Sequence, residues 1–530
     1  MNKRAITAVL GLLLLLFAAF MAIPLCIAWT VQDQFPGEFK GLGVGVGSCI
    51  LVGGILFLSF RHRLINEPLG TREGLAITTL GWLILTGFGA IPFLFADQVH
   101  LTFTASYFEV MSGLTTTGST ILPEIEKLGK GLMFWRSLTH WIGGMGIILL
   151  SVAILPLLGA GGYQLFRAEV PGVTKDRMKP RILETAKTLW LIYVGLTVAE
   201  TFMLMVCGLS LFEALCHTFG TLATGGFSTH SYSVGYFSSV QSPLSPWMGR
   251  MAEMVVILFM FLAGCNFVLL YRSAVNRSLK PLWNSSEFRC YLFMILTAIA
   301  VISILLYTEP MPAQAASAPS YLEQTYGDEQ PSIVRRATFQ SVAIVTTTGY
   351  GTDDFNVWPA TARVILLILM LAGGCAGSTG GGMKQLRIML LAKFAWRELA
   401  KVIRPRAVIQ VKHDGVPVER EVLSSLIGYF ILYIGILVVC TLAMTLLLQL
   451  DPTAVQMPGA EGPNGLLTTG FTSVLSMLSN IGPGLAGVGS IRHYGDIPEL
   501  GKWILSMCML MGRLEILTVV ALLSPYTWRK

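Results

Sequence analysis

Long apolar stretches alternate with short polar turns along nearly the whole chain. Four apolar stretches are about half as long as the roughly 20 residues that a helix needs to cross a bilayer, and each lies between two longer ones. The half-length stretches fall at 103–115, 211–222, 332–345 and 466–478. The longer stretches fall at 6–30, 41–60, 75–96, 132–157, 186–208, 247–272, 287–308, 359–392, 421–449 and 500–524. The pattern predicts an all-α polytopic membrane protein in which four short helices enter the membrane and turn back.

A polar turn ending in glycine follows each half-length stretch. The turns read Thr-Thr-Thr-Gly at 115–118, Ala-Thr-Gly-Gly at 223–226, Thr-Thr-Thr-Gly at 346–349 and Ser-Asn-Ile-Gly at 479–482. One such turn alone is typical of a helix cap, but four at matched places predict four span–pore-loop–span repeats. We expect them pseudo-fourfold around one pore, after two extra N-terminal transmembrane helices. The expected units are an N-terminal two-helix domain at 1–66 and pore repeats at 67–175, 176–280, 281–415 and 416–530.

The four turns carry chemistry suited to a monovalent cation. Extended loops expose consecutive carbonyl oxygens that can replace the water shell of an ion, and glycine permits the backbone angles that aim them inward. The C-terminal end of each short helix adds a partial negative charge near the same cavity. The sequence therefore predicts an ion filter formed by Thr116, Thr117, Gly118, Thr224, Gly225, Gly226, Thr347, Thr348, Gly349, Asn480, Ile481 and Gly482.

Composition and charge indicate a membrane protein and its orientation. Hydrophobic residues make up 53% of the 530 residues and charged residues 13%, which is about half the charged share of an average globular chain. Lys and Arg cluster at 167–187, 272–289 and 384–420, whereas 188–249 contains none. Because cytoplasmic loops are enriched in these residues, we expect both termini in the cytoplasm and the glycine turns opening outward.

The span at 359–392 contains a glycine-rich run that should break its helix within the membrane. Irregular backbone at that depth must line a cavity or be buried in protein. We interpret the run as a flexible intramembrane gate below the filter; the alternative is a glycine packing face. The gate residues are Gly373, Gly374, Gly377, Ser378, Thr379, Gly380, Gly381 and Gly382.

Two basic residues are candidates for a barrier in the pore. Arg513 lies deep in the last span, where an arginine is costly and usually faces a pore or a partner group. Pairing with Glu515 is an alternative, but residues two apart do not face each other on a helix. Lys384 follows the glycine run, and the alternative for it is a lysine that extends to the membrane interface.

Other polar residues are expected to be structural. Asp353 and Asp354 follow the third glycine turn and read as solvated loop acids, while His217 and His230 lie on either side of the second turn without a ligand cluster. The nine cysteines form no CxxC pair. With no nucleophile, base or metal constellation, the sequence does not indicate an enzyme, and we expect no cofactor in this chain.

Several motifs together resemble the TrkH/TrkG group of the Trk/Ktr/HKT potassium-transporter superfamily. They lie at 112–118, 140–146, 180–190, 223–228, 373–382 and 479–484, and so extend over nearly the whole chain. The resemblance places the four filter glycines at Gly118, Gly226, Gly349 and Gly482. It implies potassium as the transported substrate, bound at the filter residues, and an arginine at position 513 that projects into the pore. The second turn departs from the threonine pattern by carrying Gly225.

The resemblance also implies an assembly and a location. It implies a homodimer with one pore per chain in the bacterial inner (cytoplasmic) membrane, in contact with lipid and not with nucleic acid. It further implies a cytosolic TrkA-type regulatory ring that binds nucleotide. One alternative is a proton- or sodium-coupled secondary potassium transporter with alternating access, since such carriers also use repeats and broken helices. A membrane scaffold that only anchors cytosolic partners would not need four filters.

Overall fold

The fold is built almost entirely from helices. The computed structural model describes residues 2–66, 70–158, 179–309, 326, 331–514 and 516–528. Two short strands, β1 (Lys412–His413) and β2 (Val416–Pro417), form an antiparallel hairpin. The helices are α1 (Lys3–Thr30), α2 (Pro36–Asn66), α3 (Thr71–Ala90), α4 (Phe103–Leu114), α5 (Lys130–Leu158), α7 (Lys179–Val206), α8 (Leu211–Leu222), α9 (Pro246–Ala263), α10 (Phe267–Val275), α11 (Lys280–Asn284), α12 (Ser286–Thr308), α14 (Ile333–Val345), α15 (Ala360–Leu371), α16 (Gln385–Ile403), α17 (Arg420–Leu450), α18 (Gly462–Ser479), α19 (Glu499–Arg513), α20 (Ile516–Leu523) and α21 (Pro525–Trp528).

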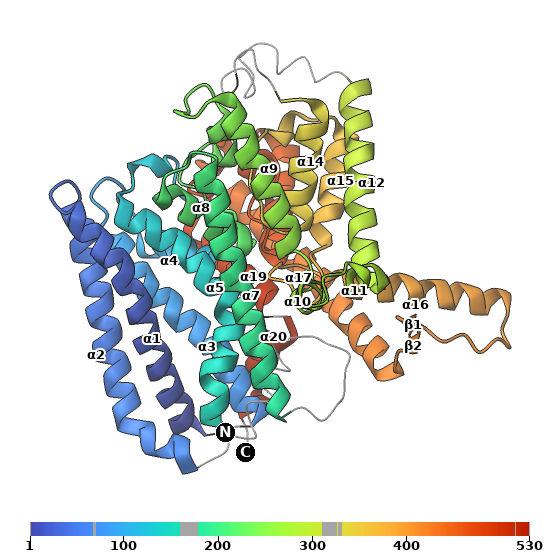
Figure 1. Cartoon of the computed structure of the whole chain (residues 1–530), viewed down its shortest axis with the longest axis horizontal. Helices are drawn as coiled ribbons and strands as arrows, with labels where there is room; N and C mark the ends of the chain where they lie inside the picture. The colour runs from blue at the N-terminus through green and yellow to red at the C-terminus, as the bar shows by residue number, and fades with distance from the viewer. Residues whose placement is uncertain are drawn as a thin grey trace.

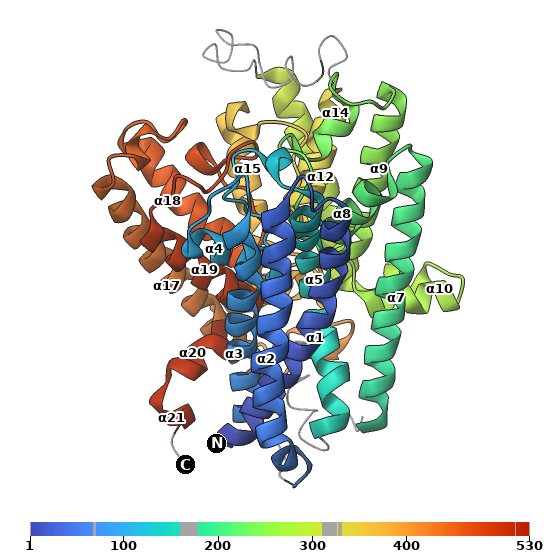
Figure 2. The ribbon, with the colours of Figure 1, turned by 90° about the vertical axis from the view of Figure 1, so that its left-hand side faces the viewer.

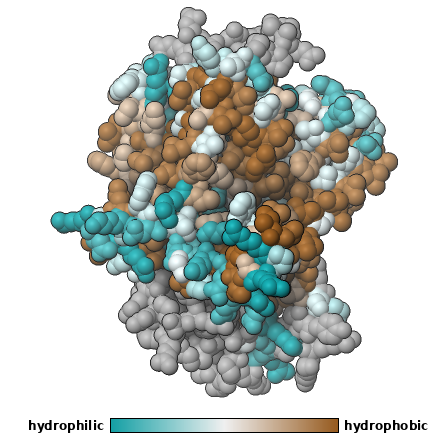
Figure 3. All heavy atoms as spheres, turned by 90° about the vertical axis from the view of Figure 1, so that its right-hand side faces the viewer, coloured by the Kyte–Doolittle hydropathy of each residue, from teal (hydrophilic) through white to brown (hydrophobic). Residues whose placement is uncertain are grey.

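Long helices run roughly side by side through the molecule, with short helices between them. α1 and α2 form a pair at one side, and the two chain ends lie at the same end of the molecule (Figures 1 and 2). α16 and the β1–β2 hairpin project from the opposite side (Figure 1). In the view that faces this side, a broad apolar zone lies above a polar zone (Figure 3). The apolar zone suits contact with lipid, because exposed apolar surface of this extent is rare on soluble proteins.

The helices agree with the predicted membrane class, but more of the ten predicted spans are interrupted than the one expected to break, at 359–392. In the described residues, seven helices are long and apolar enough to cross a membrane, or eight if the bent pair α19 and α20 forms one span. The chain is therefore a multi-pass membrane protein. The predicted basic cluster at 167–187 lies largely outside the described residues.

The four half-length helices lie where the apolar pattern predicts them. α4, α8 and α14 have 12, 12 and 13 residues, whereas α18 has 18 because it begins earlier, at Gly462. Hydroxyl side chains cap the first three: Thr102, Ser210 and Ser332 each accept a hydrogen bond from a backbone N–H in the first turn. Such caps satisfy donors that the helix itself cannot pair. The sequence thus encodes both the start and the length of α4, α8 and α14.

Three predicted spans are interrupted. α15 ends at Leu371 and α16 begins at Gln385, so the predicted break in the 359–392 stretch is confirmed. The 247–272 stretch, expected to be continuous, ends as α9 at Ala263 and restarts as α10, whose first N–H groups donate to the Asn266 side chain. The last span bends by 116° between α19 and α20. Each interruption leaves backbone polar groups within the molecule that need partners.

Candidate ion filter and the loop beneath it

All four short helices end in the same cap, and this cap forms the predicted filter turns. In each, the second residue of the turn has a left-handed backbone and the next N–H donates to the carbonyl five residues earlier, at 2.8–3.0 Å. This is the Schellman motif, whose left-handed position is usually glycine. Here that position is held by Thr116 (φ 52°), Thr224 (φ 54°), Thr347 (φ 60°) and Asn480 (φ 51°). Left-handed threonine is strained, and strain repeated at matched places indicates a functional site.

The glycine two residues later is also left-handed in every turn. The φ values are 83° at Gly118, 83° at Gly226, 73° at Gly349 and 105° at Gly482. A Cβ added to Gly118 would strike the Gly225 carbonyl oxygen, one on Gly226 the Thr348 oxygen, one on Gly349 the Ile481 oxygen, and one on Gly482 the Thr117 oxygen. These contacts run from the first turn to the second, third, fourth and back to the first. Glycine is therefore required at these positions both by backbone angle and by a neighbouring carbonyl.

Side chains behind the turns brace them differently. In the first and third turns a pair of threonine hydroxyls lies 2.8 Å apart, Thr115 with Thr117 and Thr346 with Thr348. The fourth turn uses its asparagine: the Asn480 Nδ2 donates to the Thr117 hydroxyl at 2.9 Å. The paired hydroxyls thus stabilise the first and third turns internally. The Asn480 amide links the fourth turn to the first.

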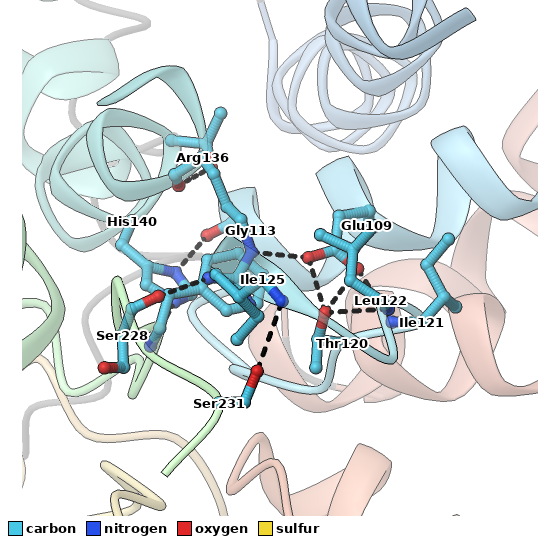
Figure 4. Close-up of polar contacts among 12 residues, drawn as sticks. Glu109, Gly113, Thr120, Ile121, Leu122, Ile125, Arg136, His140, Ser228 and Ser231 are labelled. Atoms are coloured by element: carbon cyan, nitrogen blue, oxygen red, sulfur yellow. Dashed lines mark hydrogen bonds and ion pairs between the residues drawn. The ribbon is translucent and has the colours of Figure 1, made fainter. Parts of the chain in front are cut away.

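A buried ion pair fastens the first turn to its surroundings (Figure 4). On α4, the Glu109 carboxylate accepts hydrogen bonds from the Thr120 hydroxyl at 2.9 Å and the Ile121 N–H at 2.9 Å. Arg136 on α5 donates from Nε to Glu109 at 2.6 Å and from Nη1 to the Ser228 carbonyl at 2.8 Å. Breaking a buried pair of this kind typically costs about 3–5 kcal/mol. The pair therefore joins the first turn to the segment after the second.

A second buried ion pair lies at the third turn. Here the short helix carries the arginine and the following loop carries the carboxylate. Arg336 on α14 donates to Asp353 at 2.6 Å, and the Trp358 indole donates to the same carboxylate oxygen at 2.7 Å. Asp353 is only 1% exposed and Asp354 7% exposed. The expectation that these two acids are solvated was wrong, because the loop folds back and buries them against the short helix.

The loop after the second turn holds titratable groups closer to the surface. His230 Nε2 lies 3.3 Å from Glu213, and the Ser231 N–H and hydroxyl donate to Glu126 at 2.7 and 2.6 Å. The hydrogen bond from His230 lowers the pKa of Glu213 to about 2. Burial raises the pKa of Glu126, but the bonds from Ser231 outweigh it and hold the pKa below its ordinary value. His217 bonds to the Ser228 hydroxyl at 3.1 Å, in keeping with a structural role.

The predicted gate residues lie in the irregular segment 372–384, which passes directly against the filter turns. The Gly381 N–H donates to the Thr347 hydroxyl at 2.7 Å, and a Cβ on Gly381 would lie 2.7 Å from Asn480 Cβ. The Thr379 hydroxyl donates to the Leu222 carbonyl at 2.8 Å. The segment therefore touches loops from more than one predicted repeat.

Other side chains satisfy the backbone of this segment from outside. Asn266 donates to the Ala376 carbonyl at 2.7 Å, and Glu287 on α12 accepts the Ala376 N–H at 2.6 Å. Gly377 and Gly382 are left-handed, with φ values of 76° and 63°. The break in the span is thus stabilised by side chains of neighbouring elements.

Both barrier candidates contact this segment. Arg513, at the end of α19 and 7% exposed, donates to the Thr379 carbonyl at 2.8 Å and to the Gly143 carbonyl on α5 at 2.9 Å. Lys384 donates to the Gly380 carbonyl. Glu515, the alternative partner of Arg513, lies outside the described residues. The structure thus brings the glycine run, Arg513 and Lys384 together.

Sequence reasoning missed the buried residues that support the turns. Glu109, Arg136 and Arg336 are charged residues within or beside apolar stretches. That rarity was an available signal, because intramembrane charges are usually paired and functional. The partner of each charged residue could not be predicted, because the partners lie 17 to 92 residues away along the chain.

The whole chain is similar to proteins of one transport family. It is 38% identical over 531 residues to the Trk system potassium uptake protein TrkH of Salmonella typhimurium, covering 100% of both chains. It is 31% identical over 529 residues to TrkG of Escherichia coli, covering 100% of this chain and 99% of that one. The crystal structure of the potassium transporter TrkH from Vibrio parahaemolyticus matches with a TM-score of 0.80 at 35% identity, over 100% of both chains. A family model described as TrkH, cation transport protein, matches residues 45–528. The chain therefore belongs to the TrkH family of cation transport proteins, as its motifs predicted, and is not an enzyme.

Proposed function

We propose that the chain takes up potassium through a single pore lined by its four glycine turns, as one loop from each of four pseudo-fourfold repeats. The observation that carries this proposal is the repeated backbone of the four turns. Each turn has two left-handed residues, and the second of them, a glycine, lies against a carbonyl of the next turn. Neutral carbonyl oxygens can replace the hydration shell of a potassium ion without holding it as a carboxylate would. The similarity to proteins named potassium uptake proteins supports the choice of ion.

The segment 372–384 serves in this proposal as a gate below the filter. Arg513 and Lys384 contact its carbonyls and place positive charge beside it. A positive charge beside the path lowers the occupancy of a cation there. Release of these contacts would open the path.

The remaining parts of the proposal concern assembly and location. The chain forms a homodimer in the bacterial inner membrane, with both termini cytoplasmic, and a cytosolic TrkA-type ring regulates it. The basic residues at 384–420, on α16 and the segment after it, support a cytoplasmic position for that region, since cytoplasmic loops are rich in Lys and Arg. The full length shared with Trk system proteins supports the partner class.

Uptake of potassium, rubidium and sodium into proteoliposomes, with and without a pH gradient, tests the function. A selective pore takes up potassium and rubidium far faster than sodium, at rates that follow the ion gradient alone. The three interrupted spans are also compatible with an ion-coupled carrier, because such carriers use discontinuous helices. Uptake that requires an imposed proton or sodium gradient would favour the carrier, and equal uptake of all three ions would overturn the filter.

A further inference from the structure

The second filter turn lacks the brace that supports the first and third. Where those turns have paired threonine hydroxyls, the second has Ala223 and Gly225, which carry no hydroxyl. Its backbone is nevertheless the same, with Thr224 left-handed and the Gly225 N–H donating to the carbonyl of Gly220 at 2.8 Å. A different contact must therefore take the place of the paired hydroxyls at this turn.

His140 on α5 occupies the space behind this turn. Its ring is fully buried, and a Cβ added to Gly225 would lie 2.6 Å from His140 Cγ and 2.7 Å from its Nδ1. Real Cβ atoms essentially never approach so closely. The backbone of Gly225 is not left-handed. Position 225 therefore requires glycine because of the nearby imidazole and not because of its φ angle.

The hydrogen bonds of His140 define a single protonation state. Nδ1 lies 2.8 Å from the Gly113 carbonyl oxygen (Figure 4), and the Phe227 N–H donates to Nε2 at 3.2 Å. A carbonyl can only accept and a peptide N–H can only donate. Nδ1 therefore carries the hydrogen, Nε2 offers its lone pair, and the ring is neutral.

These two bonds join different parts of the filter. Gly113 belongs to α4, the short helix before the first turn, whereas Phe227 directly follows the filter glycine of the second. The imidazole also stacks on the Phe227 ring with centroids 4.0 Å apart. One turn before His140 on α5, Arg136 contacts the same ring and bonds to the next carbonyl, that of Ser228. Residues four apart share one face of a helix, so α5 presents both side chains to this loop.

We propose that His140 is a positioning residue for ion selectivity. Its neutral imidazole replaces the missing threonine pair and fixes the height of the Gly225 carbonyl, which lies against Gly118 in the first turn. The inference rests on the proposed filter. It gives the departure of the second turn from the threonine pattern a physical cause, because a threonine at position 225 would collide with the ring.

Selective uptake by single-residue variants tests the proposal. His140→Gln can keep an acceptor near Nε2, His140→Asn can keep a donor near Nδ1, and His140→Ala keeps neither. The rubidium-to-sodium uptake ratio in proteoliposomes should fall in the order wild type, Gln, Asn, Ala. The loss for Asn should be about fivefold, which corresponds to the ~1 kcal/mol that one protein hydrogen bond contributes. His100→Asn, an exposed histidine, is the control and should keep the wild-type ratio.

A double-mutant cycle between His140 and Gly225 separates positioning from general damage to the fold. Gly225→Ala alone should reduce the ratio because its methyl group meets the imidazole. In the His140→Ala background the same change should cost much less, since the ring is gone. Additive effects, or an unchanged ratio in all His140 variants beside a selective wild type, would overturn the role of His140. A wild type that does not discriminate between the ions would instead overturn the proposed function, and with it this inference.

Discussion

The filter turns and the segment 372–384 both place glycine-rich backbone in the interior of the molecule, but they are stabilised in different ways. Each filter turn is held first by its own short helix, through the same pair of cap hydrogen bonds repeated four times. The segment 372–384 is held by side chains of other elements, among them Asn266, Glu287 and Arg513, together with backbone hydrogen bonds to Ala263 and Gly264 and within the segment itself. The cap of each turn is thus local, whereas the segment 372–384 depends on contacts with elements that are distant in the chain.

The two kinds of support indicate which part can move. A local cap forms whenever its helix forms, so the backbone of each turn persists as long as α4, α8, α14 and α18 are folded, while side chains such as His140 adjust the position of a turn. A segment held by separate tethers can lose one of them without unfolding a helix. We therefore expect selectivity to depend on the turns and the rate of flow to depend on the tethers.

The largest effect should come from Gly118→Ser. The added Cβ meets the Gly225 carbonyl oxygen and is strained at a φ of 83°, so the first and second turns must separate. Proteoliposome uptake should show near-complete loss of preference for rubidium over sodium. Gly415→Ser, at a left-handed glycine in the β1–β2 hairpin with open space around it, is the matched control. Wild-type selectivity in Gly118→Ser would contradict the assignment of the filter.

Arg513→Ala should increase the rate of rubidium uptake without changing selectivity. The change removes the charge and the hydrogen bonds to Thr379 and Gly143. Because hydrogen bonds to charged groups contribute about 1.5–3 kcal/mol, an increase of roughly tenfold or more is expected. Arg513→Lys keeps the charge but cannot span both carbonyls in the same way, so it separates the barrier from the tether. Uptake at the wild-type rate in the alanine variant would argue against both roles.

Thr347→Val tests whether the two regions communicate. The variant keeps the shape of the side chain but loses the hydroxyl that accepts the Gly381 N–H. With one hydrogen bond lost, worth about 1 kcal/mol, the uptake rate should change about fivefold. A fall in selectivity at a constant uptake rate would contradict coupling between the two regions, because Thr347 would then act only within the filter.

Lys384→Met should have the smallest effect. The lysine is partly exposed and donates to the Gly380 carbonyl, and a solvent-screened charge contributes about 1 kcal/mol or less. We expect an increase in uptake of about twofold that shrinks at high ionic strength. No dependence on salt would indicate that the lysine acts by packing alone.

The sequence predicted the frame of the site better than its supports. Half-length apolar stretches and glycine turns identify the four short helices and Gly118, Gly226, Gly349 and Gly482, because both signals are local. The division of the chain at 66, 175, 280 and 415 stays a prediction. The interruption after Ala263 was missed, since Gly264 and Asn266 lie within a stretch that is apolar on average.

The supports escaped prediction because their partners are distant in the chain. Nothing near His140 in sequence points to Phe227, 87 residues later, and Asp353 reads as a surface acid until Arg336 is placed beside it. The departure at Gly225 was visible in the sequence, but its cause was not. A local irregularity in a repeat therefore marks a place where a distant side chain should be sought.

The positions of bound ions test most directly whether the four glycine turns form one ion filter. Crystals of the protein in rubidium, with anomalous scattering recorded at the rubidium absorption edge, locate the ions independently of any transport assay. We predict a peak coordinated by carbonyl oxygens from all four turns, at the level of Gly118, Gly226, Gly349 and Gly482. A peak coordinated by only one or two turns, or none at the ring under conditions in which the protein transports rubidium, would contradict it.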